Sequence, residues 1–137
     1  MNRRTLLTAP ILAIPPLLGA ANPHLRRPYN LELWLRSELY FGTGRPGGEV
    51  SDEEFLGFVD REITPRFPDG LTLMTGYGQY LNSQGVLARE RSKILILFHP
   101  AANGDDARKI EEIREAYKSA FAQESVLRVQ EYANVSF

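Results

Sequence analysis

Three basic side chains, Arg89, Arg91 and Lys93, alternate along one stretch of the sequence. A period of two puts such residues on one face of a β-strand. Arginine binds carboxylate and phosphate groups through paired hydrogen bonds, and aromatic rings stack on the apolar body of a small ligand. These residue types favour a solvated sheet face or a self-association surface, and a binding site for a small anionic ligand is the alternative.

The preceding stretch has glycines at alternate positions, Gly76 and Gly78, where glycine weakens strand pairing and leaves room for something to approach. If Leu81 pairs with Val86 across the hairpin loop, these glycines share a face with the arginines, and a shift of one residue would exchange the two faces. We expect this face to point away from the helices, and we call it the open face. Its expected side chains are Trp34, Arg36, Glu38, Tyr40, Gly76, Gly78, Tyr80, Arg89, Arg91, Lys93, Arg128, Gln130 and Tyr132.

Two glycine motifs have contexts that argue against their usual functions. Residues 42–47 match G-x-G-x-x-G between a strand and a helix, but Pro46 removes a backbone donor and the helix begins too late for a dinucleotide site. Residues 75–78, Thr-Gly-Tyr-Gly, are similar to a potassium-channel filter, but they are not flanked by membrane helices. We predict ordinary connecting and strand segments at both places.

Metal and nucleophile chemistry is not predicted either. His99 stands alone before a proline, His24 lies in the expected linker, and Asp105 with Asp106 is typical of a helix start. There is no recognisable nucleophile elbow for Ser-His-Asp chemistry, and the absence of cysteine excludes thiol chemistry. We therefore predict no metal and no cofactor, and the catalytic residues stay unassigned.

Hydrophobic periodicity predicts the elements that position these residues. Ser51 followed by Glu54 indicates a capping box at the start of the first helix, which Pro65 ends. Strands are expected at residues 31–41, 71–81, 86–98 and 125–135, and helices at residues 51–63 and 103–121. The order βαββαβ predicts an α+β, ferredoxin-like fold with two helices on one face of a four-stranded antiparallel sheet. Glu90 would then point toward the helices and need a partner such as Arg66.

Residues 1–21 have the pattern of a secretory signal peptide, with Arg3 and Arg4 before an apolar run and small residues at its end. The Asn-Arg-Arg-Thr-Leu-Leu opening is similar to a twin-arginine signal, and the general secretory route is the alternative. The apolar run is interrupted by prolines and is shorter than the roughly 20 residues of a bilayer span. We expect a linker at residues 22–29, a single domain at residues 30–137, a periplasmic or secreted protein, and no stable membrane span after cleavage.

Five segments, residues 38–42, 64–72, 76–79, 89–93 and 123–127, resemble the bacterial family catalogued as domain of unknown function 3574. The resemblance covers nearly all of the chain that follows the signal peptide. It implies a small exported protein, often with an N-terminal signal or lipid anchor, and it assigns no activity. The polar residues in these segments are Arg66, Asp69, Gln79, Glu90, Ser92, Lys93, Glu124 and Ser125.

The net charge, and the fact that no acid–base pair or nucleophile can be singled out in the sequence, limit the classes of function that are expected. The formal charge of the chain is −1, and loss of Arg3 and Arg4 with the signal peptide would make it −3, which argues against nucleic-acid binding. We predict an exported, homodimeric binding or interaction module that uses its open face to bind a small anionic ligand or a protein partner. The alternative is a small cofactor-free enzyme of the dimeric α+β barrel type, acting on a small anionic or aromatic substrate.

Overall fold

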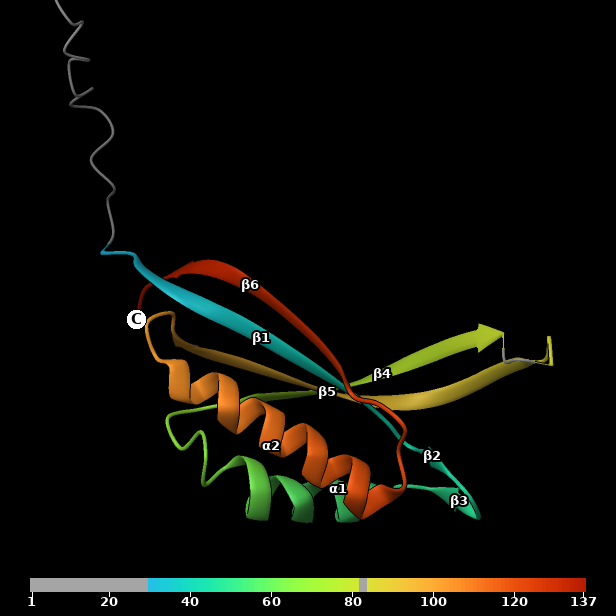
Figure 1. Cartoon of the computed structure of the whole chain (residues 1–137). Helices are drawn as coiled ribbons and strands as arrows, with labels where there is room; N and C mark the ends of the chain where they lie inside the picture. Colours follow the sequence, from blue (N-terminus) through green and yellow to red (C-terminus); the bar gives the residue numbers. More distant parts are fainter. Residues whose placement is uncertain (1–29, 82–83) are drawn as a thin grey trace, which may run out of the picture.

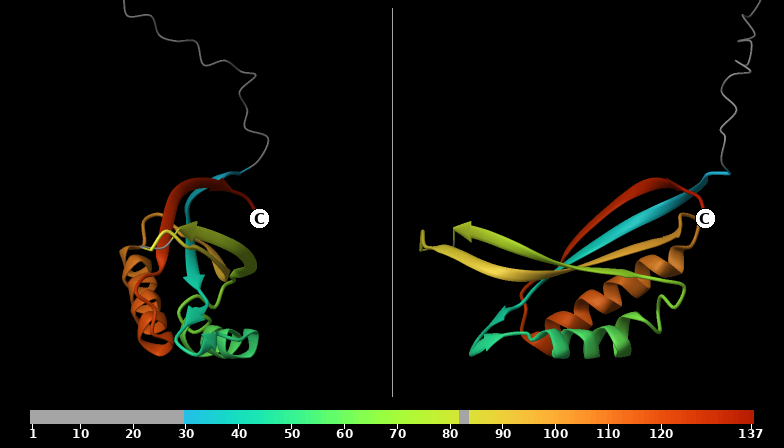
Figure 2. Two further views of the ribbon diagram at one scale, coloured as in Figure 1. Left: turned by 90° about the vertical axis from the view of Figure 1, so that its right-hand side faces the viewer. Right: turned by 180° about the vertical axis from the view of Figure 1, so that it is seen from behind.

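The sheet has four strands and carries both helices on one face. The computed structural model describes residues 30–81 and 84–137, so the predicted signal peptide and linker lie outside the described residues. Strands β1 (Glu32–Gly42), β4 (Thr72–Leu81), β5 (Leu87–Pro100) and β6 (Leu127–Val135) are antiparallel neighbours in the order β4-β5-β1-β6. Helices α1 (Asp52–Phe58) and α2 (Gly104–Phe121) lie together on one side of this sheet (Figures 1 and 2). The predicted α+β class is confirmed.

Helix α1 begins with the predicted capping box. The Ser51 hydroxyl accepts a hydrogen bond from the Glu54 amide at 3.1 Å, and the Glu54 carboxylate accepts one from the Ser51 amide at 2.9 Å. A regular helix was predicted as far as Ile63, but the chain widens into a π-helical turn, η1 (Val59–Ile63), closed by a hydrogen bond from the Thr64 amide to the Val59 carbonyl oxygen. Val59 and Ile63 are both buried in this wider turn.

A short hairpin, β2 (Gly44–Arg45) and β3 (Gly48–Glu49), occupies the glycine-rich stretch that was expected to be a plain connection. Its turn contains Gly47, whose φ of +87° is a conformation that favours glycine. The Arg45 guanidinium donates to both carboxylate oxygens of Glu54, at 2.8 and 2.9 Å. The glycines of this stretch therefore form a hairpin that is tied to the start of α1.

The core lies between the sheet and the helices and is rich in aromatic rings. Phe41 of β1 meets Tyr117 of α2 and Phe55 of α1 edge-on, with ring centroids 4.6 and 5.6 Å apart. Leu95 and Leu97 of β5 are buried beside this cluster. No helix within the described ranges is long and apolar enough to cross a membrane.

The register of the β4–β5 hairpin differs from the predicted register by one residue. Leu81 pairs with Leu87 and not with Val86, which leaves residues 82–86 between the paired positions where residues 82–85 were expected. The run Ile94–Phe98 is apolar on both faces, so its periodicity does not indicate which face packs against the helices. In the structure Leu95 belongs to the buried face.

This shift exchanges the two faces of β5. Gly76 lies opposite Ser92 and Gly78 lies opposite Glu90, so Glu90 and Ser92 are on the open face. The side chains that lie on the helix side, contrary to the prediction, are Arg89, Arg91, Lys93, Arg128, Gln130 and Tyr132. The side chains that the structure places on the open face, as predicted, are Trp34, Arg36, Glu38, Tyr40, Gly76, Gly78 and Tyr80.

Candidate functional site

Most of the basic side chains on the helix side are paired with carboxylates. The buried Lys93 ammonium group donates to the Asp52 carboxylate at 2.7 Å, and Arg91 contacts the same oxygen at 2.8 Å. The hydrogen bond from Lys93 lowers the pKa of Asp52 below its ordinary value. Arg128 contacts Glu111 of α2 at 2.8 Å. These ion pairs connect the sheet to the helices, so the basic residues do not form an exposed anion-binding surface on the open face.

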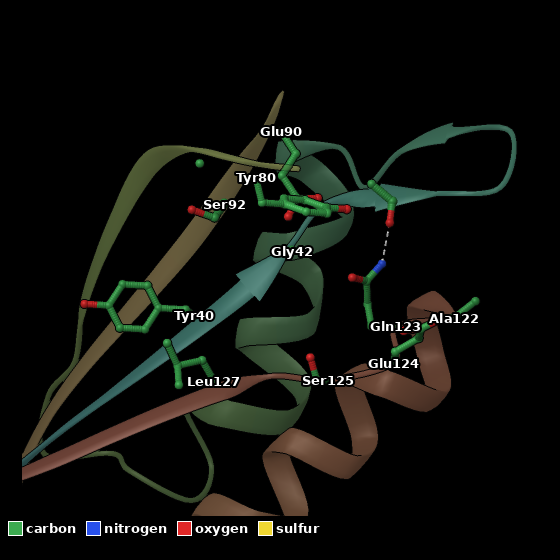
Figure 3. Close-up of a pocket in the computed structure, with 12 residues that line it drawn as sticks. Tyr40, Gly42, Tyr80, Glu90, Ser92, Ala122, Gln123, Glu124, Ser125 and Leu127 are labelled. Atoms are coloured by element: carbon green, nitrogen blue, oxygen red, sulfur yellow. Dashed lines mark hydrogen bonds between the residues drawn. The ribbon is translucent and has the colours of Figure 1, made fainter. Parts of the chain in front are cut away.

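A cavity of about 610 Å³ lies at one end of the open face, where the sheet meets the segment that follows α2 (Figure 3). Its walls present carboxylate, hydroxyl and phenol groups, and none of the described residues that line it is a lysine or an arginine. The lining residues are Tyr40, Gly42, Gly44, Gly78, Tyr80, Glu90, Ser92, Ala122, Gln123, Glu124, Ser125 and Leu127. The cavity is therefore acidic.

Glu90 is the half-buried acidic group of this cavity. Within the described part of the chain, no hydrogen bond or ion pair reaches its carboxylate. Its predicted partner, Arg66, binds Glu62 and Glu112 instead, at 2.9 and 3.2 Å. A Cβ atom at Gly44 would lie only 3.1 Å from Glu90 Oε2, so the carboxylate rests directly over the backbone. Its oxygens therefore remain free to pair with water or with a ligand in the cavity.

Side-chain hydrogen bonds hold the chain around the cavity in place. The Tyr117 hydroxyl donates to the Gly42 carbonyl oxygen at 2.8 Å, and burial raises the pKa of Tyr117, so the phenol stays protonated. The Gln123 amide donates to the Gly44 carbonyl oxygen at 2.6 Å, the contact dashed in Figure 3. Ala122 ends α2 with φ at 53°, a left-handed conformation that is unfavourable for alanine. This turn directs the next residues toward β1 and into the cavity wall.

A second polar cluster, which was not predicted, is buried between the sheet and α2. The Ser37 hydroxyl lies 3.0 Å from His99 Nε2, and His99 Nδ1 lies 3.5 Å from the Asp106 carboxylate. Ser37, His99 and Asp106 are 0%, 3% and 4% exposed. These are the residue types of a hydrolase triad, but a fully buried serine has no access to a substrate. The Ser37–His99 hydrogen bond joins β1 to β5, whereas His99 Nδ1 lies near Asp106 of α2 without a hydrogen-bond partner in the described chain.

His99 gives the folded protein an expected pH dependence. Burial lowers the pKa of His99 below its ordinary value of 6.5, and the attraction of Asp106 only partly opposes this effect. The unfolded chain therefore binds a proton at a pH where the folded chain does not, so acid favours unfolding. We expect the free energy of unfolding to fall as the pH is lowered from 7.5 to 5, by at most about 1.4 kcal/mol per pH unit from this group.

Urea denaturation at a series of pH values measures this effect. The variant His99→Gln keeps a polar side chain that cannot titrate, and it should show a smaller slope over the same range. Equal slopes for the two proteins would show that His99 does not control the acid sensitivity.

The structure brings together four of the polar residues named by the family resemblance. Glu90, Ser92, Glu124 and Ser125 all line the 610 Å³ cavity. Arg66 and Asp69 line a separate cavity of about 320 Å³ beside His99, and Gln79 accepts a hydrogen bond from Arg89 at 3.5 Å. The residues could be named from the sequence, but their proximity could not, because strand β5 and the segment after α2 meet only in the tertiary structure.

Comparisons with known proteins give a family and a fold. A family model described as "Protein of unknown function (DUF3574)" matches residues 36–137. No curated protein matches the chain. Two similar solved structures share 16% sequence identity with it at a TM-score of 0.55. The first is a phage SAM lyase in complex with S-methyl-5′-thioadenosine, and the match covers 76% of this chain and 90% of that chain. The second is a phage SAM lyase in the apo state, with coverages of 82% and 95%. Identity at this level shows a shared fold.

Proposed function

The chain belongs to the DUF3574 family of proteins of unknown function. Because this family assigns no activity, the function has to be inferred from the site, and we propose that the protein binds a small cationic molecule in the cavity beside Glu90. The half-buried Glu90 carboxylate, which no described residue pairs, is the observation that carries this proposal. A bound cation would supply the missing ion pair or charge-assisted hydrogen bond. The charge is opposite to that of the anion expected from the sequence, because the basic side chains of β5 lie on the other face.

The size and walls of the cavity suit a ligand with an aromatic body. Its volume of about 610 Å³ is within the usual range for small-molecule sites. Tyr40 and Tyr80 supply aromatic rings, and Ser92 and Ser125 supply hydroxyl groups that pair with ligand polar atoms. Because the similar folds are those of a phage SAM lyase, the first probes are S-adenosylmethionine, which carries a sulfonium cation, and S-methyl-5′-thioadenosine, its uncharged thioether counterpart.

Isothermal titration calorimetry with these two probes tests the proposal. We expect S-adenosylmethionine to bind more tightly than S-methyl-5′-thioadenosine, because only the former has a cation for Glu90. Gly78→Val should weaken the binding of both, since Gly78 lines the cavity. Thr72→Val, on the same strand but away from the cavity, is the matched control and should bind normally. Absence of binding, or tighter binding of the uncharged probe, would contradict the proposal.

The second candidate function is the cofactor-free enzyme, with Glu90 as a general base. The favouring observation is that Glu90 shares one cavity with the Tyr80 phenol and the Ser92 hydroxyl, which are groups that can donate hydrogen bonds to a substrate. The test is incubation with S-adenosylmethionine followed by mass spectrometry. In this reaction Glu90 would remove a proton from Cβ of the aminobutyrate moiety, the Cγ–S bond would break with its electron pair going to the sulfur, and S-methyl-5′-thioadenosine and an unsaturated amino acid would be released. Formation of both products that depends on Glu90 would favour the enzyme, and unchanged S-adenosylmethionine would favour simple binding.

Three further proposals concern the whole protein. Export to the periplasm or the medium is supported by the signal-like pattern of residues 1–21. A ferredoxin-like fold is supported by the element order, which becomes βαββαβ when the short β2–β3 hairpin is treated as an insertion. A homodimer is supported by the aromatic and apolar side chains exposed on the sheet. Intact mass of the exported protein and its sedimentation behaviour test the first and the third.

A further inference from the structure

Strand β4 is an unprotected edge of the sheet. The two edge strands are β4 and β6, because the sheet order is β4-β5-β1-β6. The outer edge of β4 makes no backbone hydrogen bond with the rest of the described chain. Strand edges with unpaired amides and carbonyls pair readily with another chain, and proteins usually prevent this with charged residues, prolines or bulges. The sequence of β4, TLMTGYGQYL, has neither a charge nor a proline, whereas β6 contains Arg128 and Glu131.

The C-terminal half of β4 also projects from the body of the protein. Figures 1 and 2 show β4 and β5 continuing past both helices as a two-stranded arm. Tyr77 and Leu81, on this arm, are 87% and 70% exposed. A two-stranded ribbon is marginally stable in water, and large apolar side chains on it favour a partner that covers them.

We infer that β4 pairs antiparallel with β4 of a second copy of this chain across a two-fold axis. Two features favour a second copy as the occupant of the edge. Because β4 has no charged residue, two copies of it can pair without placing like charges opposite each other. The same lack of charge means that β4 cannot form ion pairs with a charged partner of another kind. The same patch can also serve both subunits of a symmetric dimer.

The glycines of β4 are not part of this contact. Gly76 and Gly78 lie on the open face, whereas an added strand pairs with the edge in the plane of the sheet. A Cβ atom at Gly78 would have only the Glu90 carbonyl oxygen, at 4.0 Å, as a neighbour in the described chain. Because the edge contact leaves the open face free, the cavity beside Glu90 stays accessible in the dimer.

Sedimentation of the purified protein tests the edge contact. We expect a dimer, and Tyr77→Lys should raise its dissociation constant by at least about tenfold, because it adds a like charge to each of the two adjoining strands. The matched control is Tyr132→Lys on the other edge strand, where the side chain is 71% exposed and the dimer should be unaffected. Circular dichroism verifies that both variants stay folded.

Disulfide cross-linking locates the contact, because the chain has no cysteine of its own. Single variants Thr75→Cys, Tyr77→Cys and Gln79→Cys place a thiol along β4, and a disulfide forms only where two Cα atoms approach to roughly 4.4–6.8 Å. We expect a cross-linked dimer for at least one of them and none for Val129→Cys on the open face. A wild-type protein that sediments as a monomer overturns the inference, and this holds also if a peptide of another sequence pairs with the β4 edge. Cross-linking through Val129→Cys alone overturns it too.

The edge contact rests on the proposed homodimer and is independent of the proposed ligand. Calorimetry on the same samples separates the two. Binding of S-adenosylmethionine by a monomer overturns the edge contact alone, and a β4-linked dimer that binds no cation overturns the ligand proposal alone.

Discussion

Replacement of Phe41 by alanine is expected to lower the free energy of unfolding by about 3–5 kcal/mol, the usual cost of removing a large aromatic side chain from a core. Phe41 is fully buried, and its ring meets Phe55, Phe58 and Tyr117 edge-on, with centroids 5.6, 6.4 and 4.6 Å away. Its removal therefore leaves a cavity at the point where β1, α1 and α2 converge. Such a loss is a large part of the stability of a small domain.

Chemical denaturation monitored by circular dichroism measures the effect of Phe41→Ala. Phe137→Ala is the control, because Phe137 is 98% exposed and its ring meets Trp34 edge-on at 5.2 Å, so its replacement should change the free energy of unfolding by less than about 1.5 kcal/mol. A small loss for Phe41→Ala would mean that the helices are not packed on the sheet in this way. The cavity depends on the same packing, since Phe41 precedes Gly42 and contacts Tyr117, whose hydroxyl bonds the Gly42 carbonyl oxygen.

The variant Glu90→Gln is expected to weaken the binding of S-adenosylmethionine by about 10- to 150-fold, which corresponds to the roughly 1.5–3 kcal/mol of a hydrogen bond to a charged group. Glutamine keeps the shape of the side chain and removes its charge. Binding of the uncharged S-methyl-5′-thioadenosine should therefore change by less than about threefold, since it makes no ion pair. The difference between the two ligands isolates the charge of Glu90 from its contribution to the cavity wall.

Calorimetric titration of wild type and variant with both probes gives the four affinities. Glu131→Gln is the matched control, because Glu131 is also on the open face but is paired with Arg36 at 2.9 Å and does not line the cavity. An equal loss for the charged and the uncharged probe would show that Glu90 shapes the cavity without binding a cation. No loss for either probe would place the ligand elsewhere.

Local features of this protein could be predicted from the sequence because each depends on near neighbours in the chain. Ser51 and Glu54 form the predicted capping box, since both partners lie within one helical turn. Asn103 caps α2 where the sequence indicated the start of a helix, with its side chain accepting a hydrogen bond from the Asp105 amide. The alternation in β1 correctly assigned Trp34 and Tyr40 to the open face. The family resemblance, which rests on short contiguous segments, is confirmed for the same reason.

The site itself was decided by the tertiary structure. The run Ile94–Phe98 is apolar on both faces, so only packing against α1 and α2 selects Leu95 for the core, and this selection sets the register with β4. A pairing shifted by one residue moves every side chain of a strand to the other face. For that reason Lys93 is buried against Asp52, while Glu90 faces a cavity completed by residues that follow α2. Glu90 of β5 and Ser125 after α2 become neighbours only when the sheet and helices pack. A local sequence pattern cannot predict this contact.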